Sequence, residues 1–441
     1  MTEDELDRLY ALLRVPSVSA LPEHGADMAR AAALVADEVR RAGGHAEVRP
    51  GRHPLVVGEV PAASGDPRAP RVLLYGHYDV QPAGDPALWT SPPFAPEVRD
   101  GALYARGASD DKGNLFMMLA AVQRLAAGPG LPVRVGVVVD GEEESGGDTA
   151  LRHLAGDPEP AVAALIFDTA MAGPERPMVC AGLRGLVYRR VRVRTGVRDA
   201  HSGMFGGAAL NAAHALMRVL DAVLPRDGRL PAALTAGAVP PTLAEREAWA
   251  GIPAGARMLA EAGMRPADAA AAEEFYARTL GGPSLDVHGL ACGDPGAVKT
   301  NIPCEASATL SLRVAPGQDA HALAAALDRM LHDAAPAGAE VHVEDLHVAS
   351  PALLDPGRPE IAAAVRAIAE ATGWPCVPVR SGGTIPVVAT LAARGVPVVL
   401  TGFGLPDDAI HAPDEHLRFD HLETGTRAAM QILVRLGELH A

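Results

Sequence analysis

The sequence predicts an α/β protein with a doubly wound, mostly parallel sheet and an inserted α+β segment, and three observations support this fold class. Short apolar runs with almost no polar interruption, such as RVLLYGH near residue 74, are typical of parallel strands buried on both faces. Helical patterns alternate with these runs, which favours right-handed crossovers within one sheet. Between about Leu183 and Ala349, polar residues recur at every second position of the strands, as in a sheet with one face in water.

The N-terminal elements are predicted from their caps and their spacing. Thr2 and Glu5 have capping-box spacing, so a helix should begin there, and a second helix should run from about Ala26 to Arg41 and stop at Gly43. Buried strands are expected near residues 74, 137, 166 and 399. Between the first two of these strands lies GNLFMMLAAVQRLAAG, which has the period of a helix.

The inserted segment has a different pattern. In VYRRVRVRTG, Val191 and Val193 alternate with arginines, and similar patterns follow in ASATLSLRV near residue 310 and AEVHVEDLHV near residue 343. Helical patterns at about 208–223 and 318–332 lie among these strands, which predicts a small antiparallel, ferredoxin-like α+β domain. We also expect the Ala-rich stretch PADAAAAEEF to be helical.

The length indicates more than one domain, because 441 residues exceed what one hydrophobic core usually supports. After the insert, RPEIAAAVRAIAEATG and PVVLTGF return to the first pattern. The expected domains are therefore a main domain in two parts, 1–182 and 351–441, and an inserted domain over 183–350.

The composition argues against several classes of partner. The formal net charge of −15 disfavours nucleic acid, since phosphate binding draws on clustered Lys and Arg. No apolar run reaches the ~18 residues that span a bilayer, and the N-terminal MTEDELDRLYALL carries acids where a secretion signal carries bases. We therefore expect a cytoplasmic protein without membrane contact. The four cysteines form no CxxC pair, which argues against a thiolate zinc site.

Acidic and imidazole side chains follow the predicted buried strands. In an open parallel sheet the carboxyl ends of the strands face the ligand crevice. The pattern places there His77 and Asp79 after the first strand, Asp140 to Glu144 after the second, Asp168 after the third, His411 after the last, and Asp110 in a Gly-rich turn before a helix. Several carboxylates at one crevice would repel one another, and a divalent cation between them is the economical explanation.

The kinds of ligand limit the metal. Two His with three or more carboxylates and no Cys suit zinc, manganese or cobalt, whereas an all-oxygen set would suit magnesium or calcium. Five ligands are too many for one open catalytic zinc site, but two ions that share one carboxylate would use them all. Such a pair of ions activates a bridging water and polarises a carbonyl in hydrolysis.

The motifs around these residues resemble those of a known enzyme family. They are, in chain order, GHYDVQPA, ARGASDDKG, EEESG, IFD, DAHSGMFGG, SLRV, RSGGTIP and HAPDEH. In this order and approximate spacing they resemble the aminoacylase, carnosinase and glutamate-carboxypeptidase family of dinuclear zinc hydrolases, over nearly the whole chain. The long form from YGHYDVQPAG to ARGASDDKG, together with PSLDVHGL, is similar to the dipeptidase branch of that family.

The resemblance implies a set of metal ligands. Asp110 would bridge two divalent ions, most simply zinc, with manganese or cobalt as alternatives. His77 and Asp168 would complete one ion, and Glu144 and His411 the other.

It also implies roles for residues around the ions. Glu143 would be the general base, taking a proton from the bridging water and returning it to the leaving amine. Asp79 would hydrogen-bond His77 and fix its tautomer. The peptide bond between Asp110 and Asp111 would be cis.

The inserted segment resembles the family's lid, which also mediates dimerisation, so we expect a homodimer. His201 in DAHSGMFGG matches a histidine that reaches into the site of the other subunit and stabilises the developing oxyanion. The positions that match those holding the C-terminal carboxylate of the substrate are Arg313, Thr300, Gly382, Gly383 and Thr384.

The substrate stays open between two related classes. The same chemistry serves dipeptides or short peptides with a free C-terminus and N-acyl or N-carbamoyl amino acids, because the metal ions act on an amide carbonyl whatever flanks it. Ser381 stands where the dipeptidase branch often has Glu, near the expected carboxylate pocket, and HAPDEH replaces the commoner HSPNE. A non-catalytic relative is a third hypothesis, but a binding module has little use for Glu143.

Overall fold

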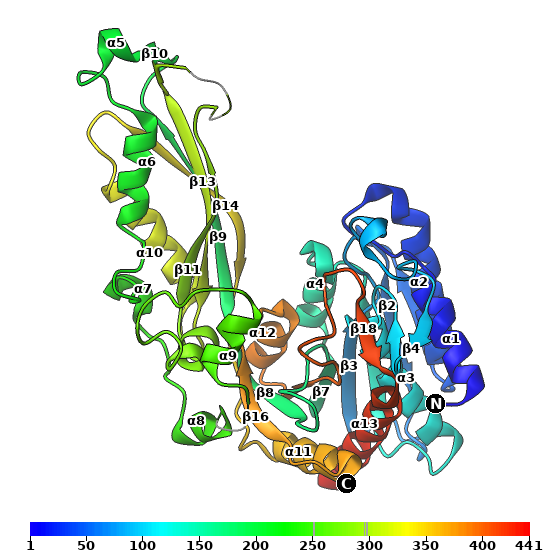
Figure 1. The fold of residues 1–441 in the computed structure, drawn as a ribbon. Coiled ribbons are helices and arrows are strands. Elements are labelled where there is room, and N and C mark those ends of the chain that lie inside the picture. Colours follow the sequence, from blue (N-terminus) through cyan, green and yellow to red (C-terminus); the bar gives the residue numbers. More distant parts are fainter. Residues whose placement is uncertain (250–251, 295, 297–298) are drawn as a thin grey trace. The chain divides into compact units, whose positions relative to one another are not determined.

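The computed structural model describes residues 1–249, 252–294, 296 and 299–441, and Figure 1 labels its helices and strands. The chain divides into two compact units. The main unit comprises residues 1–181, 354–379 and 390–441, and the inserted unit comprises residues 182–353 and 380–389. The chain passes from one unit to the other within β8 (Met178–Leu183) and β16 (Val377–Ser381).

The main unit is built on a sheet with the strand order β1-β2-β6-β3-β7-β17. Its strands are β1 (His45–Arg49), β2 (Leu55–Val60), β6 (Arg134–Asp140), β3 (Arg71–His77), β7 (Ala163–Phe167) and β17 (Val398–Thr401). β6, β3, β7 and β17 run parallel, and β2 and β1 extend the sheet with antiparallel pairs. Every residue of β3 and β7 is buried, as in parallel strands covered on both faces. The predicted mostly parallel α/β sheet is confirmed.

The helices of the main unit include those that the sequence predicted. They are α1 (Glu3–Leu13), α2 (Gly25–Arg41), α3 (Lys112–Ala127), α4 (Thr149–Gly156), α11 (Pro359–Thr372) and α13 (Phe419–Leu439), while the sequence of α12 (Pro386–Ala393) runs from the inserted unit into the main unit. The predicted capping box is present, since Thr2 Oγ1 accepts from the Glu5 N–H at 3.2 Å and the Glu5 carboxylate accepts from the Thr2 N–H at 2.7 Å. Among the helices that the structure describes, none is both long and apolar enough to cross a bilayer.

The inserted unit is built on an antiparallel sheet with the strand order β11-β13-β9-β14. Its strands are β9 (Gly185–Arg194), β11 (Ser284–Ala291), β13 (Glu305–Val314) and β14 (Glu340–Ala349). Val187, Val191 and Val193 are fully buried in a core shared with α6 (Ala212–Asp221) and α10 (Ala320–Asp333), and arginines alternate with them. The predicted alternation and both predicted helices are confirmed.

Smaller elements complete the two units. The main unit adds β4 (Glu97–Arg99), β5 (Ala102–Tyr104) and β18 (His416–Arg418); the inserted unit adds β10 (Ala200–His201), α5 (Ser202–Phe205), α7 (Ala232–Thr235), α8 (Leu243–Trp249), α9 (Gly255–Glu261), β12 (Asn301–Ile302) and β15 (Ala352–Leu353). The Ala-rich stretch near residue 270 forms turns, so the expectation of a helix there was wrong. Asp268 accepts from the Ala270 N–H at 2.9 Å and pairs with Arg278, and such side-chain bonds compete with a helix.

Arg124 joins three helices of the main unit. Its guanidinium donates to Glu5 of α1 at 2.8 Å and to Glu423 of α13 at 2.7 Å. These hydrogen bonds lower the pKa of both carboxyls from the ordinary value of 4.5 to about 2. The resulting stabilisation is fully present above pH 4.5 and is lost as the pH falls toward 2.

We predict that Arg124→Met lowers the free energy of unfolding by about 1 kcal/mol at pH 7, since both pairs are partly exposed and screened by solvent. The difference from the unsubstituted protein should narrow as the pH falls from 5 to 3, measured by urea unfolding. Arg435→Met, which removes an exposed pair with Glu370, is the matched control and should change stability by less than about 0.5 kcal/mol. Equal effects of the two substitutions would contradict the prediction.

Candidate metal centre

The carboxyl ends of the parallel strands bring the predicted ligands to one edge of the main sheet. His77 is the last residue of β3, Asp168 follows β7, and Glu144 lies in a short turn after β6. Because β3 pairs with β6 on one side and β7 on the other, these three residues are neighbours. Asp110 precedes α3 and His411 lies in the loop after β17.

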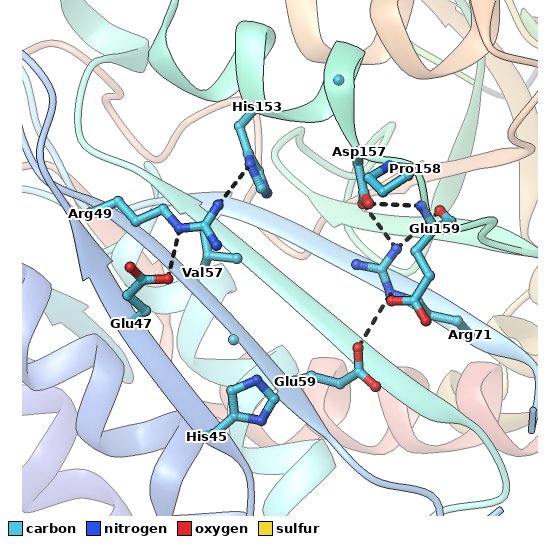
Figure 2. A pocket seen from close by; sticks show the side chains of 12 residues that line it. His45, Glu47, Arg49, Val57, Glu59, Arg71, His153, Asp157, Pro158 and Glu159 are labelled. Atoms are coloured by element: carbon cyan, nitrogen blue, oxygen red, sulfur yellow. Dashed lines mark hydrogen bonds and ion pairs between the residues drawn. The ribbon is translucent and has the colours of Figure 1, made fainter. Parts of the chain in front are cut away.

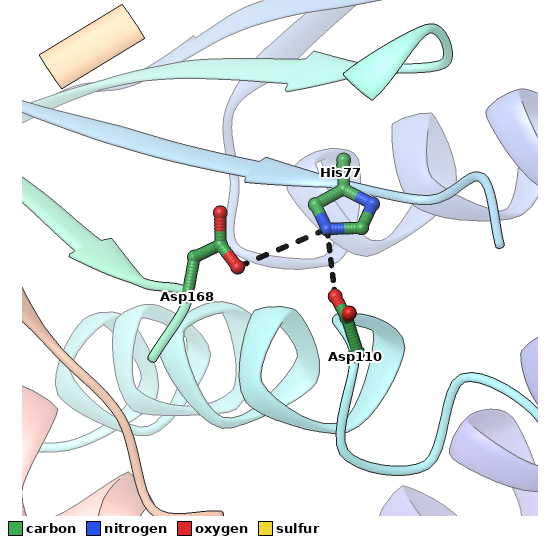
Figure 3. A group of neighbouring side chains, drawn as sticks. All are labelled: His77, Asp110 and Asp168. Atoms are coloured by element: carbon green, nitrogen blue, oxygen red, sulfur yellow. Dashed lines mark hydrogen bonds and ion pairs between the residues drawn. The ribbon is translucent and has the colours of Figure 1, made fainter. Parts of the chain in front are cut away.

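A first group consists of His77, Asp110 and Asp168, and Figure 3 shows their side chains pointing toward one another. His77 Nε2 lies 3.1 Å from Asp110 Oδ1 and 4.0 Å from Asp168 Oδ1. One potential ligand atom from each of the three side chains lies within 4.8 Å of the others. This separation suits three ligands around one small cation.

A second group consists of Asp110, Glu144 and His411. His411 Nε2 lies 2.9 Å from Asp110 Oδ2 and 3.3 Å from Glu144 Oε2. The two oxygens of Asp110 therefore face different groups. Two cation positions that share this one carboxylate are compatible with the arrangement.

Unpartnered buried atoms support a cation in these groups. Among the described residues, Asp168 Oδ2 and Glu144 Oε1 are buried without a hydrogen-bond partner. A buried carboxylate oxygen without a donor is costly unless a cation or a proton compensates it. Imidazole nitrogens with carboxylate oxygens are the donors that zinc, manganese and cobalt accept, so the residues fit divalent metal binding.

The contacts of both imidazoles favour their charged forms. Hydrogen bonds to Asp110 and Glu144 raise the pKa of His411 to about 10. Burial disfavours a charged His77, but its contacts with Asp110 and Asp79 outweigh burial and raise its pKa well above the usual range. A metal ion would replace these protons at the same nitrogens.

Glu143 lies beside both groups, and its carboxyl has a raised pKa. Burial raises its pKa well above the ordinary value, and the charges of Asp168, Glu144 and Asp110 add to this effect against the opposing influence of His77. A carboxyl with a raised pKa can hold a proton near neutral pH.

Asp79 hydrogen-bonds both His77 and the turn that follows β6. The backbone carbonyl of Asp79 accepts from His77 Nδ1 at 3.0 Å, and its carboxylate lies farther away at 3.4 Å. This bond leaves Nε2 of His77 to face Asp110. The Asp79 carboxylate accepts from Ser19 Oγ at 2.6 Å and from the Glu144 N–H at 3.1 Å, which positions the turn after β6.

The loop that carries Asp110 is held by Glu415, to which the sequence interpretation assigned no role. The buried carboxylate of Glu415 accepts from the N–H groups of Gly107, Ser109 and Asp110 at 2.9, 3.0 and 3.0 Å, and from Arg106 at 2.7 Å. Glu415 belongs to the motif HAPDEH, so the sequence marked its position, but it did not predict its hydrogen-bond partners. The Asp110–Asp111 peptide bond is cis, as the resemblance implied.

The residues expected to bind a carboxylate lie in two places within the inserted unit. Thr384 Oγ1 accepts from Arg313 at 3.1 Å and donates to the Arg184 carbonyl at 2.7 Å. Gly382 lies beside them, since its carbonyl accepts from Arg184 Nε at 3.3 Å. The N–H of Gly383 donates to Ser381 Oγ at 3.2 Å.

Thr300 lies beside His201 and at the other end of β13 from Arg313. The Thr300 carbonyl accepts from the Ser202 N–H at 2.9 Å, next to the exposed His201, whose Nδ1 accepts from the Gly203 N–H at 3.0 Å. Thr300 precedes β13, whereas Arg313 is near its last residue, and the stretch of the strand from Glu305 to Arg313 spans roughly 25 Å. Within one inserted unit, Thr300 and Arg313 therefore cannot hold the same carboxylate.

Comparison with known proteins identifies relatives over almost the whole chain. The family model described as Peptidase family M20/M25/M40 matches residues 73–435. A cysteinylglycine-S-conjugate dipeptidase of Corynebacterium striatum is 31% identical over 459 residues, covering 98% of this chain and 95% of that protein. The human β-Ala-His dipeptidase is 28% identical, and the alignment covers 98% of this chain and 89% of that protein.

A solved structure agrees with these relatives. The M20 family metallo-carboxypeptidase of Sulfolobus solfataricus superposes with a TM-score of 0.86 at 25% identity, covering 99% of this chain and 100% of the other. The chain belongs to peptidase family M20/M25/M40, in the branch whose relatives are dipeptidases.

Proposed function

We propose that the chain hydrolyses the amide bond of dipeptides or short peptides with a free C-terminal carboxylate, in a metal-dependent reaction in the cytoplasm. The observation that carries this proposal is that two groups of potential metal ligands share Asp110, and that Glu143 lies beside both groups. The dipeptidase names of its relatives support dipeptides over N-acyl amino acids as substrates. The main unit would be the catalytic domain and the inserted unit a lid that also dimerises.

Two divalent cations are proposed, zinc in the first instance with manganese or cobalt as alternatives. His77 and Asp168 would hold one, Glu144 and His411 the other, and Asp110 both. When bound, such cations polarise an amide carbonyl and lower the pKa of water.

The chain itself supplies the proton transfers. Glu143 would accept a proton from the attacking water and deliver it to the departing amine nitrogen, a cycle that needs a carboxyl with a pKa near neutrality. The raised pKa of Glu143 supports this role. Asp79 would act as a positioning residue, because it bonds both His77 and the turn that carries Glu143.

We predict that Glu143→Gln lowers kcat for dipeptides by at least 10²-fold and leaves the metal content near two ions per chain, because the base is lost and the ligands remain. Turnover would be screened on dipeptides against N-acyl and N-carbamoyl amino acids with zinc, manganese and cobalt. Asp148→Asn, an exposed acid a few residues further on, is the control and should stay active. Loss of metal from Glu143→Gln would instead identify Glu143 as a ligand.

A second prediction separates the shared ligand from a single-ion ligand. Asp110→Asn should remove both ions, whereas Asp168→Asn should remove one, because only Asp110 belongs to both groups. Metal content per folded chain would be measured by mass spectrometry after dialysis, with folding checked by circular dichroism. An Asp110→Asn protein that keeps two ions would exclude the shared carboxylate.

A homodimer through the inserted unit is supported by an apolar edge on that unit. β11 pairs with β13 on one side and ends the sheet on the other. Beside it lies a cavity of about 460 Å³ lined by α6 and β11, whose Met217 and Leu290 are 66% and 70% exposed. A strand at the edge of a sheet, next to exposed apolar side chains, is what a second copy would cover.

The placement of His201 also supports a dimer. His201 and Thr300 lie together, roughly a strand length from Arg313, so their proposed roles suit the site of a second copy. The His201 imidazole would then donate a hydrogen bond to the oxyanion that forms there.

We predict that a mixture of His201→Ala and Glu143→Ala chains recovers part of the lost activity, because one of the two sites in a mixed dimer has both groups intact. The mixture would be prepared by refolding together, and mixed dimers would be verified with distinct affinity tags. Each variant alone is the control and should stay inactive. Verified mixed dimers without recovery would exclude a role for His201 across the interface.

A further inference from the structure

Two guanidinium groups lie next to each other in the inserted unit, at the end of the sheet near β16. Arg184 precedes β9, and Arg313 of β13 pairs in register with Leu186 of β9 and Ser284 of β11. Thr384 links the two arginines, since its Oγ1 accepts from Arg313 and donates to the Arg184 carbonyl. Arg184 Nη1 donates to Ser284 Oγ at 3.2 Å.

These two arginines have only neutral partners. Among the described residues, no carboxylate lies within ion-pair distance of either Arg184 or Arg313, whose hydrogen-bond acceptors are a carbonyl and two hydroxyls. The more deeply buried arginines of this protein each have an acid: Arg106 pairs with Glu415 at 2.7 Å, Arg380 with Glu245 at 2.6 Å, and Arg189 with Asp345 at 2.6 Å. The Arg184–Arg313 pair thus differs from these three buried arginines, each of which has an acidic partner.

The pair is electrostatically unfavourable as it stands. Burial lowers the pKa of Arg184 to about 10, and the adjacent charge of Arg313 adds to this effect. Burial also lowers the pKa of Arg313, and the more distant Asp286 only partly offsets it. Two desolvated like charges are retained at a functional site when an anion arrives to compensate them.

The backbone of Gly382 packs closely against the Arg184 guanidinium. A Cβ at Gly382 would lie 2.9 Å from the Thr279 carbonyl and 3.2 Å from Arg184 Nη2, so glycine allows this segment to approach the guanidinium. Ser381, the preceding residue, contributes a short neutral side chain whose Oγ accepts from the Gly383 N–H. An acid at 381 would add a negative charge next to this segment.

We propose that Arg184 and Arg313 together bind two carboxylates, so that the enzyme prefers peptides whose C-terminal residue is aspartate or glutamate. One guanidinium fork binds one carboxylate, and two adjacent forks match the α-carboxylate and the side-chain carboxylate of an acidic residue. This inference rests on the proposed dipeptidase function and narrows its substrate class. Arg184, which the sequence interpretation did not single out, becomes a specificity-determining residue.

The test compares L-alanyl-L-glutamate with the isosteric L-alanyl-L-glutamine. The metal-loaded enzyme should show a kcat/KM at least tenfold higher for the glutamate peptide, mainly through KM, because a charged hydrogen-bonded pair replaces a neutral one. Arg184→Gln should bring the ratio to about one. Ser381→Glu should also bring the ratio to about one while Arg184 is intact. This second variant keeps the test decisive if Arg184→Gln does not fold. Arg190→Gln, on the same strand but paired with Glu344, is the control and should keep the ratio.

A binding measurement separates this inference from the proposed function. Calorimetry with L-glutamate and L-glutamine as probes should give at least tenfold tighter binding of glutamate, lost in Arg184→Gln. Equal kcat/KM values for the two peptides, with normal turnover of both, would overturn the two-carboxylate pocket and leave the dipeptidase. If no dipeptide is hydrolysed, the proposed function fails. Tighter binding of glutamate than of glutamine would then still support the two-carboxylate site, and equal binding would overturn it.

Discussion

The carboxylate of Asp110 lies between two imidazoles, and its position determines the geometry of the whole candidate centre. One oxygen lies 3.1 Å from His77 Nε2 and the other 2.9 Å from His411 Nε2. The strand and the loop that carry these histidines meet because parallel strands end at one edge of a sheet. The carboxylate of Glu415 accepts hydrogen bonds from the N–H groups of the loop that carries Asp110. A residue 305 positions away in sequence therefore fixes the position of the Asp110 carboxylate. The site is therefore a property of the folded main unit and of no single segment.

Charge balance explains why this edge can be so acidic. The carboxylates of Asp110, Asp168 and Glu144 are brought together in surroundings that disfavour charge, and burial raises the pKa of Asp168 well above its usual range. Protons on His77 and His411 or metal ions at the same nitrogens can each compensate the negative charge. Folding thus produces a site that is already arranged for cations.

The three consecutive glutamates after β6 illustrate what the sequence can and cannot predict. Glu142 accepts from the His53 N–H at 2.9 Å and from Thr149 Oγ1 at 3.0 Å, and it is buried as a structural residue. Glu143 and Glu144 lie at the centre described above. The apolar strand before them predicted that an acid would reach the sheet edge, but spacing alone did not separate the three roles. The resemblance assigned roles only to Glu143 and Glu144, and the direction of each side chain depends on the turn that Asp79 holds.

The arginine pair was harder to predict for a related reason. Alternation identified β9 and β13 as strands, and the motif SLRV identified Arg313, but the register that sets Arg313 beside Leu186 is a property of pairing. Arg184 lies outside the alternating run, so no pattern marked it. That neither arginine forms an ion pair with a described acid is visible only once the positions of all described carboxylates are known.

The length of β13 constrains how the inserted unit can take part in catalysis. Arg313 is near one end of this strand, and the segment that carries Thr300 and His201 adjoins the other, roughly 25 Å away. A dipeptide in extended form is much shorter than this distance, since two residues span roughly 7 Å. The two ends of one inserted unit therefore cannot contact one dipeptide. If both ends act in catalysis, each active site needs groups from two chains, and assembly becomes a condition of activity.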